Sequence, residues 1–347
     1  MKQFLPFKQI KEQDQVVVVD AMHHHGLILS HWRGAPQIPG IHDDTSLGIV
    51  LNAIKAKHPS VHYPRITNNH FDIDGFLGVW SLFEPELALR YEEALREAAL
   101  IGDFREYDPK RPGSELGLKL ACWLNAIERN EFYAPFGEKD EAVACIPKYE
   151  FCLPRFAEVL QHPERFAAEW GSEYEQVRQH EEVMRSAKSR LHYLPEIQLL
   201  IIDTPEPLHY YALFGQSREA DMVLSCYDDH RYELEYKYTS WVDTAHRKHY
   251  PRLPLEPLAE QLEAQEFSDE SWFADRMMDT GPILRLGGVG LSKAERYDHP
   301  FRRPIYSSSI APEIVKAVVM SFFRLRLTDV PMRKHWTWAE MREYANR

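Results

Sequence analysis

The sequence predicts an α/β protein of two domains, because three features point the same way. The chain has 347 residues, which exceeds the usual size of one compact domain. Its first half alternates short apolar runs with segments of helical spacing, as in a mostly parallel sheet flanked by helices. From about Leu194 the segments become strand-like. We therefore expect an N-terminal α/β domain over residues 1–192 and a smaller C-terminal α+β domain over residues 193–347.

Three strands are expected in the N-terminal domain: Val16–Val19, Gly26–Trp32 and Arg65–Asn68. The first is an unbroken run of valines that ends at Asp20, so we expect a buried strand with a carboxylate at its C-terminal end. A helix should follow Asp44 or Thr45, whose side chains can cap it, and run through Lys57. Further helices are expected over residues 85–102, 114–130 and 153–191.

The C-terminal domain is expected to hold three strands, over residues 196–203, 220–227 and 231–242. Asp228, Asp229 and His230 stand between two of these strands, and short polar residues at such a place favour a hairpin turn. An apolar helix is expected over residues 312–325.

Charge and composition argue against some classes of partner. A formal net charge of -12 argues against a protein that binds long nucleic acid, which needs a basic surface. A small anionic substrate stays open, because bound cations invert the field of an acidic pocket. The N-terminus lacks the apolar core of a signal peptide, and no apolar run approaches the ~20 residues that cross a bilayer. We expect a cytoplasmic protein that does not bind membranes; the oligomeric state, a homodimer included, stays open.

The four cysteines, Cys122, Cys145, Cys152 and Cys226, show no CxxC spacing. They therefore indicate neither a zinc knuckle nor a redox pair, and we expect reduced, buried thiols.

Chemistry is indicated by three residues that alternate at the end of the strand at 65–68. In an extended segment His70, Asp72 and Asp74 can converge on one face and offer one nitrogen and two carboxylates. Carboxylates suit Mn²⁺ or Mg²⁺, and imidazole shifts the preference towards Mn²⁺, Fe²⁺, Co²⁺ or Zn²⁺. Gly75 then permits a tight turn into the next helix. In the alternative interpretation Asp72 and Asp74 only cap that helix, and His70 is a surface histidine.

The segment NHFDIDGFLGVWSLF resembles the first motif of the DHH phosphoesterase superfamily, H-x-D-x-D-G followed by a helix of small residues. The resemblance implies two divalent cations, commonly manganese, and hydrolysis of phosphodiester or pyrophosphate bonds by an activated water. His70, Asp72 and Asp74 would be ligands. Asp103, which follows a Gly-containing helix end in REAALIGDF, would be a further ligand; alternatively it is a solvated carboxylate beside a C-cap.

The order of the segments departs from this superfamily. No Asp-His-His triplet follows Asp74, and the nearest equivalent lies upstream in VVVVDAMHHHGLILSHW, which contains Asp20, His25 and His31. A circularly permuted, divergent member would explain this order. The glycine-rich GGGH segment that binds phosphate in the companion domain is not found either. The resemblance covers about 120 residues.

Two further groups are candidates for catalysis. His25 or His31 would complete the metal shell or donate a proton to the leaving group; a solvent-facing or core histidine is the alternative. Four arginines near aromatic residues offer forks for a phosphate or carboxylate, namely Arg247, Arg252, Arg276 and Arg285. We take Arg247 as the candidate that binds the substrate anion, and ordinary surface pairing is the alternative.

These features together predict a metal-dependent hydrolase of phosphoester or pyrophosphate bonds in a small anionic substrate. Its metal ligands would be Asp20, His70, Asp72, Asp74 and Asp103, and its cofactor Mn²⁺, with Mg²⁺, Fe²⁺ or Zn²⁺ as alternatives. Two other classes stay open. A non-haem iron oxygenase would use two histidines and a carboxylate. A non-catalytic scaffold that binds a ligand or partner would explain the missing triplet.

Overall fold

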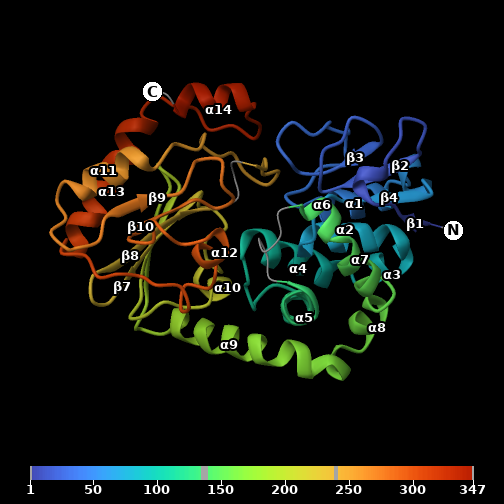
Figure 1. Cartoon of the computed structure of the whole chain (residues 1–347), viewed down its shortest axis with the longest axis horizontal. Coiled ribbons are helices and arrows are strands. Elements are labelled where there is room, and N and C mark those ends of the chain that lie inside the picture. Colours follow the sequence, from blue (N-terminus) through green and yellow to red (C-terminus); the bar gives the residue numbers. More distant parts are fainter. Residues whose placement is uncertain (1, 134–139, 238–240, 346–347) are drawn as a thin grey trace. The chain divides into compact units, whose positions relative to one another are not determined.

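The chain divides into two compact units, unit 1 (Met1–Gln176) and unit 2 (Val177–Arg347). The computed structural model describes residues 2–133, 140–237 and 241–345. Figure 1 shows helices and a sheet in each unit, and the α/β class expected from the sequence is confirmed. The units are nearly equal in length, and their boundary lies inside a helix rather than at residue 192, because that charged helix contributes to both units.

Unit 1 contains a four-stranded sheet in which every pairing is parallel, in the order β1-β4-β2-β3. Its strands are β1 (Gln3–Phe4), β2 (Val16–Val19), β3 (Leu27–Leu29) and β4 (Arg65–Thr67). The bounds of β2 agree with the prediction, and its four valines have no exposed surface. A central parallel strand that is covered on both faces explains an uninterrupted apolar run.

The connection from β2 to β3 takes only residues 20–26, whereas parallel strands usually need a dozen or more residues between them. The chain reverses with positive φ at both ends of this loop, 49° at Asp20 and 92° at Gly26. A Cβ atom at Gly26 would lie 2.7 Å from Val16 Cγ1. The loop therefore returns tightly along β2, and only glycine fits at its last position.

The helices of unit 1 are α1 (Ser46–Lys55), α2 (Ile73–Phe83), α3 (Pro85–Arg90), α4 (Glu92–Phe104), α5 (Ser114–Ile127), α6 (Glu141–Ala144), α7 (Ile146–Cys152), α8 (Phe156–Gln161) and the first part of α9 (Ala167–Arg185). Short turns lie at η1 (Phe7–Gln9), η2 (Pro59–His62), η3 (Glu128–Phe132) and η4 (Pro163–Phe166). Thr45 caps α1 as predicted, since its side chain accepts a hydrogen bond from the Gly48 N–H. The helix expected over 153–191 is interrupted at Pro163, which lacks an N–H.

Unit 2 contains a six-stranded mixed sheet in the order β5-β6-β7-β8-β10-β9. Its strands are β5 (Arg190–Leu194), β6 (Leu199–Asp203), β7 (Met222–Tyr227), β8 (Arg231–Tyr236), β9 (Trp272–Ala274) and β10 (Ile283–Leu286). The predicted hairpin turn is confirmed, because β7 and β8 are antiparallel and Asp229 and His230 both have positive φ. Residues 238–240 of the strand expected over 231–242 lie outside the described residues.

Helices cover both faces of this sheet. Leu199 and Ile201 of β6 belong to one apolar cluster, together with residues of α11 (Glu256–Glu263) and α13 (Pro312–Leu327). Leu200 and Ile202 belong to a second cluster, with α10 (Tyr210–Leu213) and the end of α9. Unit 2 is completed by α12 (Lys293–Arg296) and α14 (Trp338–Ala345). Among the described residues of the whole chain, every helix is too short or too polar to cross a lipid bilayer.

Candidate metal centre

The carboxyl ends of three neighbouring strands of unit 1 each lead into a polar residue. Asp20 follows β2, His31 lies two residues after β3, and Asn68 follows β4 and opens the segment that carries His70. Because these strands are parallel, their carboxyl ends share one edge of the sheet, which is where open α/β sheets bind ligands.

Asp20 lies at the centre of this group and is 1% exposed. Its Oδ1 is 3.3 Å from His31 Nε2, and its Oδ2 is 3.2 Å from His70 Nε2. One carboxylate therefore faces two imidazoles with two different oxygens. The residue also has a φ of 49°, in the left-handed region that few residues other than glycine adopt.

Further carboxylates divide the cluster into two halves. In the first half, His31 Nε2 lies 3.2 Å from Asp103 Oδ2 and 3.8 Å from Asp74 Oδ2. In the second half, His70 Nε2 lies 3.0 Å from Asp72 Oδ2. Asp20, His31 and Asp74 place their donor atoms within 4.8 Å of one another, and so do Asp20, His70 and Asp72. Each half therefore offers nitrogen and oxygen donors that could hold one divalent ion.

The second ring nitrogen of each histidine is fixed by an oxygen acceptor. His31 Nδ1 donates to the Asp44 carbonyl oxygen at 2.5 Å, and His70 Nδ1 lies 2.8 Å from Asn69 Oδ1. Ser46 Oγ donates to Asp20 Oδ1 at 2.6 Å and accepts from the His31 N–H at 3.1 Å. Such outer contacts orient imidazoles in metal sites, because a proton on Nδ1 turns Nε2 towards the ion.

Asp72 and Asp74 also hold the two helices that begin at the site. Asp72 Oδ1 accepts from the Gly75 N–H at 2.8 Å and caps α2, while its Oδ2 faces His70. Asp74 accepts from the backbone N–H groups of Ser46 at 2.7 Å and Leu47 at 2.9 Å, at the start of α1. A helix-capping role for these two carboxylates is therefore compatible with metal binding. Asp72 still directs an oxygen at His70, and Asp74 directs one at His31.

The cluster strongly perturbs the acidity of its members. Burial disfavours a charge on Asp20, but hydrogen bonds from His31 and His70 hold its pKa well below the usual range. Burial also opposes a charge on His31, yet Asp20 and Asp103 raise its pKa to about 10. Burial, and then the charge of Asp20, raises the pKa of Asp74 to about 7. Burial, followed by the charge of Asp74, raises the pKa of Asp103 well above its ordinary value. The raised pKa values of Asp74 and Asp103 mean that protons offset part of the negative charge of these carboxylates. A bound cation could offset the same charge in place of the protons.

Glycines allow this close packing. A Cβ atom at Gly75 would lie 2.2 Å from Asn68 Nδ2 and 3.2 Å from Asp20 Oδ2. A Cβ atom at Gly78 would lie 2.7 Å from Val19 Cγ1, on the strand that ends at Asp20. The glycines of the α2 motif thus let this helix approach the end of β2.

All five residues expected to bind metal come together in unit 1, namely Asp20, His70, Asp72, Asp74 and Asp103. His31, expected as a catalytic residue, lies among them. His25 does not join the cluster. It precedes Gly26 and β3, at the amino edge of the sheet, and its backbone N–H donates to His23 Nδ1 at 3.0 Å.

Arg247, the expected anion-binding residue, lies in unit 2 and takes part in its internal hydrogen bonding. It forms an ion pair with Asp221 at 2.8 Å and donates to the carbonyl oxygens of Arg218 and Ala220. Its side chain is 8% exposed. Arg252 is likewise buried and donates to backbone carbonyl oxygens, Lys237 among them.

The sequence patterns do not mark Ser46 and Asn69 as site residues, although both orient the cluster from outside. Their positions carried a usable signal, because Ser46 directly follows the N-cap Thr45 and Asn69 lies two residues after the end of β4 at the same sheet edge. Polar residues at such junctions point their side chains towards a ligand site more often than those inside helices.

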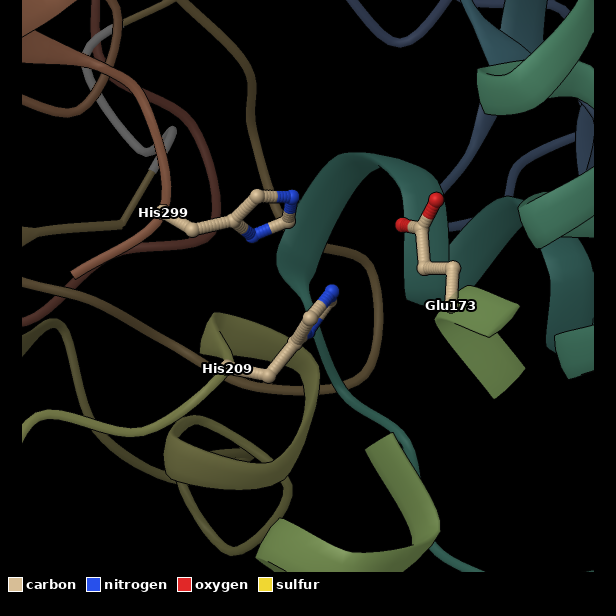
Figure 2. A group of neighbouring side chains, drawn as sticks. All are labelled: Glu173, His209 and His299. Atoms are coloured by element: carbon tan, nitrogen blue, oxygen red, sulfur yellow. The ribbon is translucent and has the colours of Figure 1, made fainter. Parts of the chain in front are cut away.

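Figure 2 shows a second pair of histidines, His209 and His299, in unit 2. Both are buried, and their ring centroids lie 4.2 Å apart. His209 Nδ1 accepts from the Tyr211 N–H at 3.2 Å, which caps α10, and His299 stacks on Tyr210. Glu173, drawn in the same figure, belongs to unit 1, where its carboxylate accepts hydrogen bonds from Asn125 and Arg129. The histidine pair therefore holds α10 within unit 2.

No curated protein and no solved structure matches this chain. A family model matches residues 1–334, a span that includes the whole cluster of unit 1 and nearly all of unit 2. The chain therefore belongs to the family of unknown function DUF6687.

Proposed function

We propose that this protein is a metal-dependent hydrolase of phosphoester or pyrophosphate bonds in a small anionic substrate, and that it acts at the cluster of unit 1. The observation that carries the proposal is the buried carboxylate of Asp20, whose two oxygens face two separate groups of ligands. A carboxylate in this position can bridge two cations, as in the two-metal sites that catalyse phosphoryl transfer.

The donor set suits two divalent ions. Each half supplies one imidazole, and the halves share the carboxylate of Asp20; Asp74 and Asp103 belong to one half and Asp72 to the other. Four ionised carboxylates would balance two divalent cations. The mixture of nitrogen and oxygen donors favours Mn²⁺, with Fe²⁺, Zn²⁺ and Mg²⁺ as weaker alternatives.

Divalent ions held here would lower the pKa of a water molecule and stabilise negative charge on the attacked phosphoryl oxygen. The chain fixes the direction of approach. The side chains of His31 and Asp74 are at most 2% exposed, whereas that of His70 is 22% and that of Asp72 40% exposed. A substrate therefore reaches the cluster on the side of His70 and Asp72. The ring of His31 is fixed by the hydrogen bond from its Nδ1 to the Asp44 carbonyl oxygen. Its proposed role is therefore to orient the charged groups of the cluster, and not to contact solvent.

The resemblance to the DHH-type phosphoesterases supports the same function. The motif residues His70, Asp72 and Asp74 lie with Asp20, which comes from the neighbouring strand β2. In this chain β2 precedes the motif, as a permuted order of the two halves requires. We also propose a cytoplasmic setting, which the four buried free thiols support, since reducing compartments keep such thiols unpaired.

A non-haem iron oxygenase is the second candidate from the sequence. Such a site needs two histidines and one carboxylate around a single ion. His31 and His70 face different oxygens of Asp20, so each half contains one histidine. This division favours the hydrolase.

The test is the Asp20→Asn variant, with Asp140→Asn, an exposed carboxylate of unit 1, as the matched control. Asparagine keeps the size of the side chain and tolerates the left-handed backbone, but it cannot bridge two cations. After loading with Mn²⁺ and desalting, we expect two ions per chain in the wild type and in the control, and at most one in Asp20→Asn. Release of phosphate from pyrophosphate or a model phosphodiester should fall by at least ~100-fold, the usual effect of losing a principal catalytic group.

Three outcomes would contradict the proposal. Full Mn²⁺ occupancy in Asp20→Asn would show that the ions bind elsewhere. A wild type that binds no metal would indicate a non-catalytic scaffold. Turnover that needs iron and oxygen would indicate an oxygenase.

A further inference from the structure

Arg285 on β10 carries a guanidinium group that is fully buried but only partly hydrogen-bonded. Its Nη1 donates to the Arg296 carbonyl oxygen at 3.2 Å, and the nearest carboxylate oxygen, Glu233 Oε1, lies 3.9 Å from that same atom. Within the described part of the chain, Nε and Nη2 have no hydrogen-bond partner. The residue has no exposed surface, so these two donors do not reach bulk water.

A neighbouring arginine shows what this edge of the guanidinium normally binds. Arg303 donates from Nε to Glu233 Oε1 at 2.8 Å and from Nη2 to Glu233 Oε2 at 2.7 Å. Its Nε and Nη2 thus form the two-pronged fork that matches a carboxylate or a phosphate. In Arg285 the same two nitrogens have no acceptor among the residues that the structure describes. Glu233 does not supply one, because its nearest oxygen lies 3.9 Å away and faces Nη1, and because both of its oxygens are directed at Arg303.

Asp275, the other carboxylate that acts on Arg285, is engaged as well. Asp275 pairs through Oδ1 with Arg296 and accepts from the Ile283 N–H through Oδ2. Burial lowers the pKa of Arg285, and although Glu233 and Asp275 favour its charge, Arg303 and Arg296 oppose it. A buried, positive fork without an acceptor is costly, unless a ligand supplies the missing oxygens.

The backbone beside the fork carries no side chain that covers it, because glycines stand next to it. Strand β10 ends at Leu286 and continues into the loop Gly287–Gly290, in which Gly287 and Gly288 both have positive φ. A Cβ atom at Gly288 would lie 3.2 Å from Arg285 Nε, so any side chain there would cover the fork. Val289 in the same loop is 69% exposed, and a Cβ atom at Gly290 would meet no atom within 4 Å. The loop that passes the fork at Gly288 is therefore exposed at its next two residues.

The geometry points to an oxyanion site in unit 2, in which Nε and Nη2 of Arg285 bind two oxygens of a phosphate or carboxylate group beside Gly288. This site does not depend on the metal centre of unit 1. It gives Arg285 the anion-binding role for which Arg247 was a candidate, since Arg247 is already paired with Asp221.

The experiment measures binding of inorganic phosphate and, separately, of acetate to the full chain by calorimetry. The chain is first freed of metal with a chelator, so that phosphate does not bind to ions in unit 1. We expect saturable binding of at least one of the two anions, and the comparison identifies the preferred oxyanion. Arg285→Met and Arg285→Lys should both weaken it about 10- to 100-fold, because lysine keeps the charge but not the fork. The control is Arg302→Met, an exposed arginine whose nearest carboxylate, that of Asp298, lies 4.0 Å away; its binding should not change.

A second measurement excludes a general loss of folding. Without anion, Arg285→Met should unfold at the wild-type temperature or above it, since a buried unpaired group has been removed. With anion, the rise in unfolding temperature seen in the wild type should disappear. Gly288→Ala should weaken binding, whereas Gly290→Ala should not. Unchanged affinity in Arg285→Met, or no binding of either anion to the wild type, would overturn the inference, whatever the outcome at Asp20.

Discussion

At the scale of single residues, the cluster of unit 1 depends on the two carboxylate oxygens of Asp20, which face different histidines. Asp20 adopts a backbone conformation that aspartate tolerates better than most residues, and this presents its two oxygens to His31 and His70. A strained residue is retained where the surrounding structure holds it and where function benefits. The hydroxyl of Ser46 provides part of that support.

We predict that Ser46→Ala destabilises the metal-free protein by about 1–3 kcal/mol, because it leaves Asp20 Oδ1 and the buried His31 N–H each without one hydrogen bond. Urea denaturation in the presence of a chelator measures the effect. Ser81→Ala is the matched control, since that buried hydroxyl donates to the Leu77 carbonyl oxygen within α2. The control should change the free energy of unfolding by less than about 0.5 kcal/mol. Equal effects of the two variants would contradict a supporting role for Ser46.

At the scale of elements, α2 reaches the proposed metal centre because its glycines let it pack directly on β2. Gly78 faces Val19, the last residue of β2 before Asp20. The helix begins at Ile73, directly after its N-cap Asp72, so the position of the helix also sets the position of a proposed metal ligand. A displacement of α2 should therefore disturb stability and metal binding together.

Gly78→Ala should lower the free energy of unfolding by about 1–3 kcal/mol, because the added methyl group would lie 2.7 Å from Val19 Cγ1. Affinity for Mn²⁺ should fall in the same variant. Gly171→Ala in α9 is the control, since its Cβ atom would meet no atom within 4 Å. Alanine is the better helix former, and the control should gain about 0.5–1 kcal/mol. A gain in stability for Gly78→Ala would refute the close packing of α2 on β2.

A carboxylate joins two loops of unit 2 and makes its stability depend on pH. Glu266 accepts hydrogen bonds from Ser308 Oγ at 2.5 Å, from Ser309 Oγ at 2.6 Å and from the Trp272 indole at 3.0 Å. Burial opposes ionisation, but the hydrogen bonds from Ser308, Ser309 and Ser268 lower the pKa of Glu266 from 4.5 to about 2. The folded state therefore binds this proton more weakly than the unfolded state does.

The stabilisation from Glu266 should be complete above about pH 4.5 and lost as the pH falls through about 2. Glu266→Gln removes the titrating group, so its free energy of unfolding should decline less steeply over this interval than that of the wild type. Denaturation curves at a series of acidic pH values measure the difference. Glu313→Gln, an exposed position in α13, should follow the wild type. Parallel curves for wild type and Glu266→Gln would show that the lowered pKa is absent.

At the scale of the whole molecule, each unit has its own sheet and its own buried core. The proposed metal centre lies entirely in unit 1, whereas the ion pair of Arg303 with Glu233 and Glu235 is buried in unit 2. A ligand or a substitution should therefore stabilise or destabilise mainly the unit that contains it.

Differential scanning calorimetry should show two transitions. Mn²⁺ at about 100 times its dissociation constant should raise one of them by roughly 5–10 °C, the shift expected for a unit of this size. Arg303→Met should lower the other, because loss of one partner of a buried ion pair costs about 3–5 kcal/mol. Arg302→Met, at an exposed position, is its control. A single transition that responds equally to metal and to Arg303→Met would mean that the units unfold together.

Much of the fold could be predicted from local patterns. The valine run of β2, the cap of α1 at Thr45 and the turn between β7 and β8 follow from interactions between residues close in sequence. The division of the helix expected over 153–191 was missed, although Pro163 marks it. The domain boundary was placed too late, because the charged pattern of α9 does not show where one core ends and the next begins.

The sequence by itself determined the residue types and spacing of the candidate site, since His70, Asp72 and Asp74 follow a strand and precede a helix. Only the tertiary structure decided which distant residues join them. It brought Asp20, His31 and Asp103 into the cluster, and it left His25 at the other edge of the sheet. It also distinguished Arg247 from Arg285, which look alike in sequence. The physical reason is that strand pairing and burial set these distances and partners, and both depend on contacts between segments far apart in the chain.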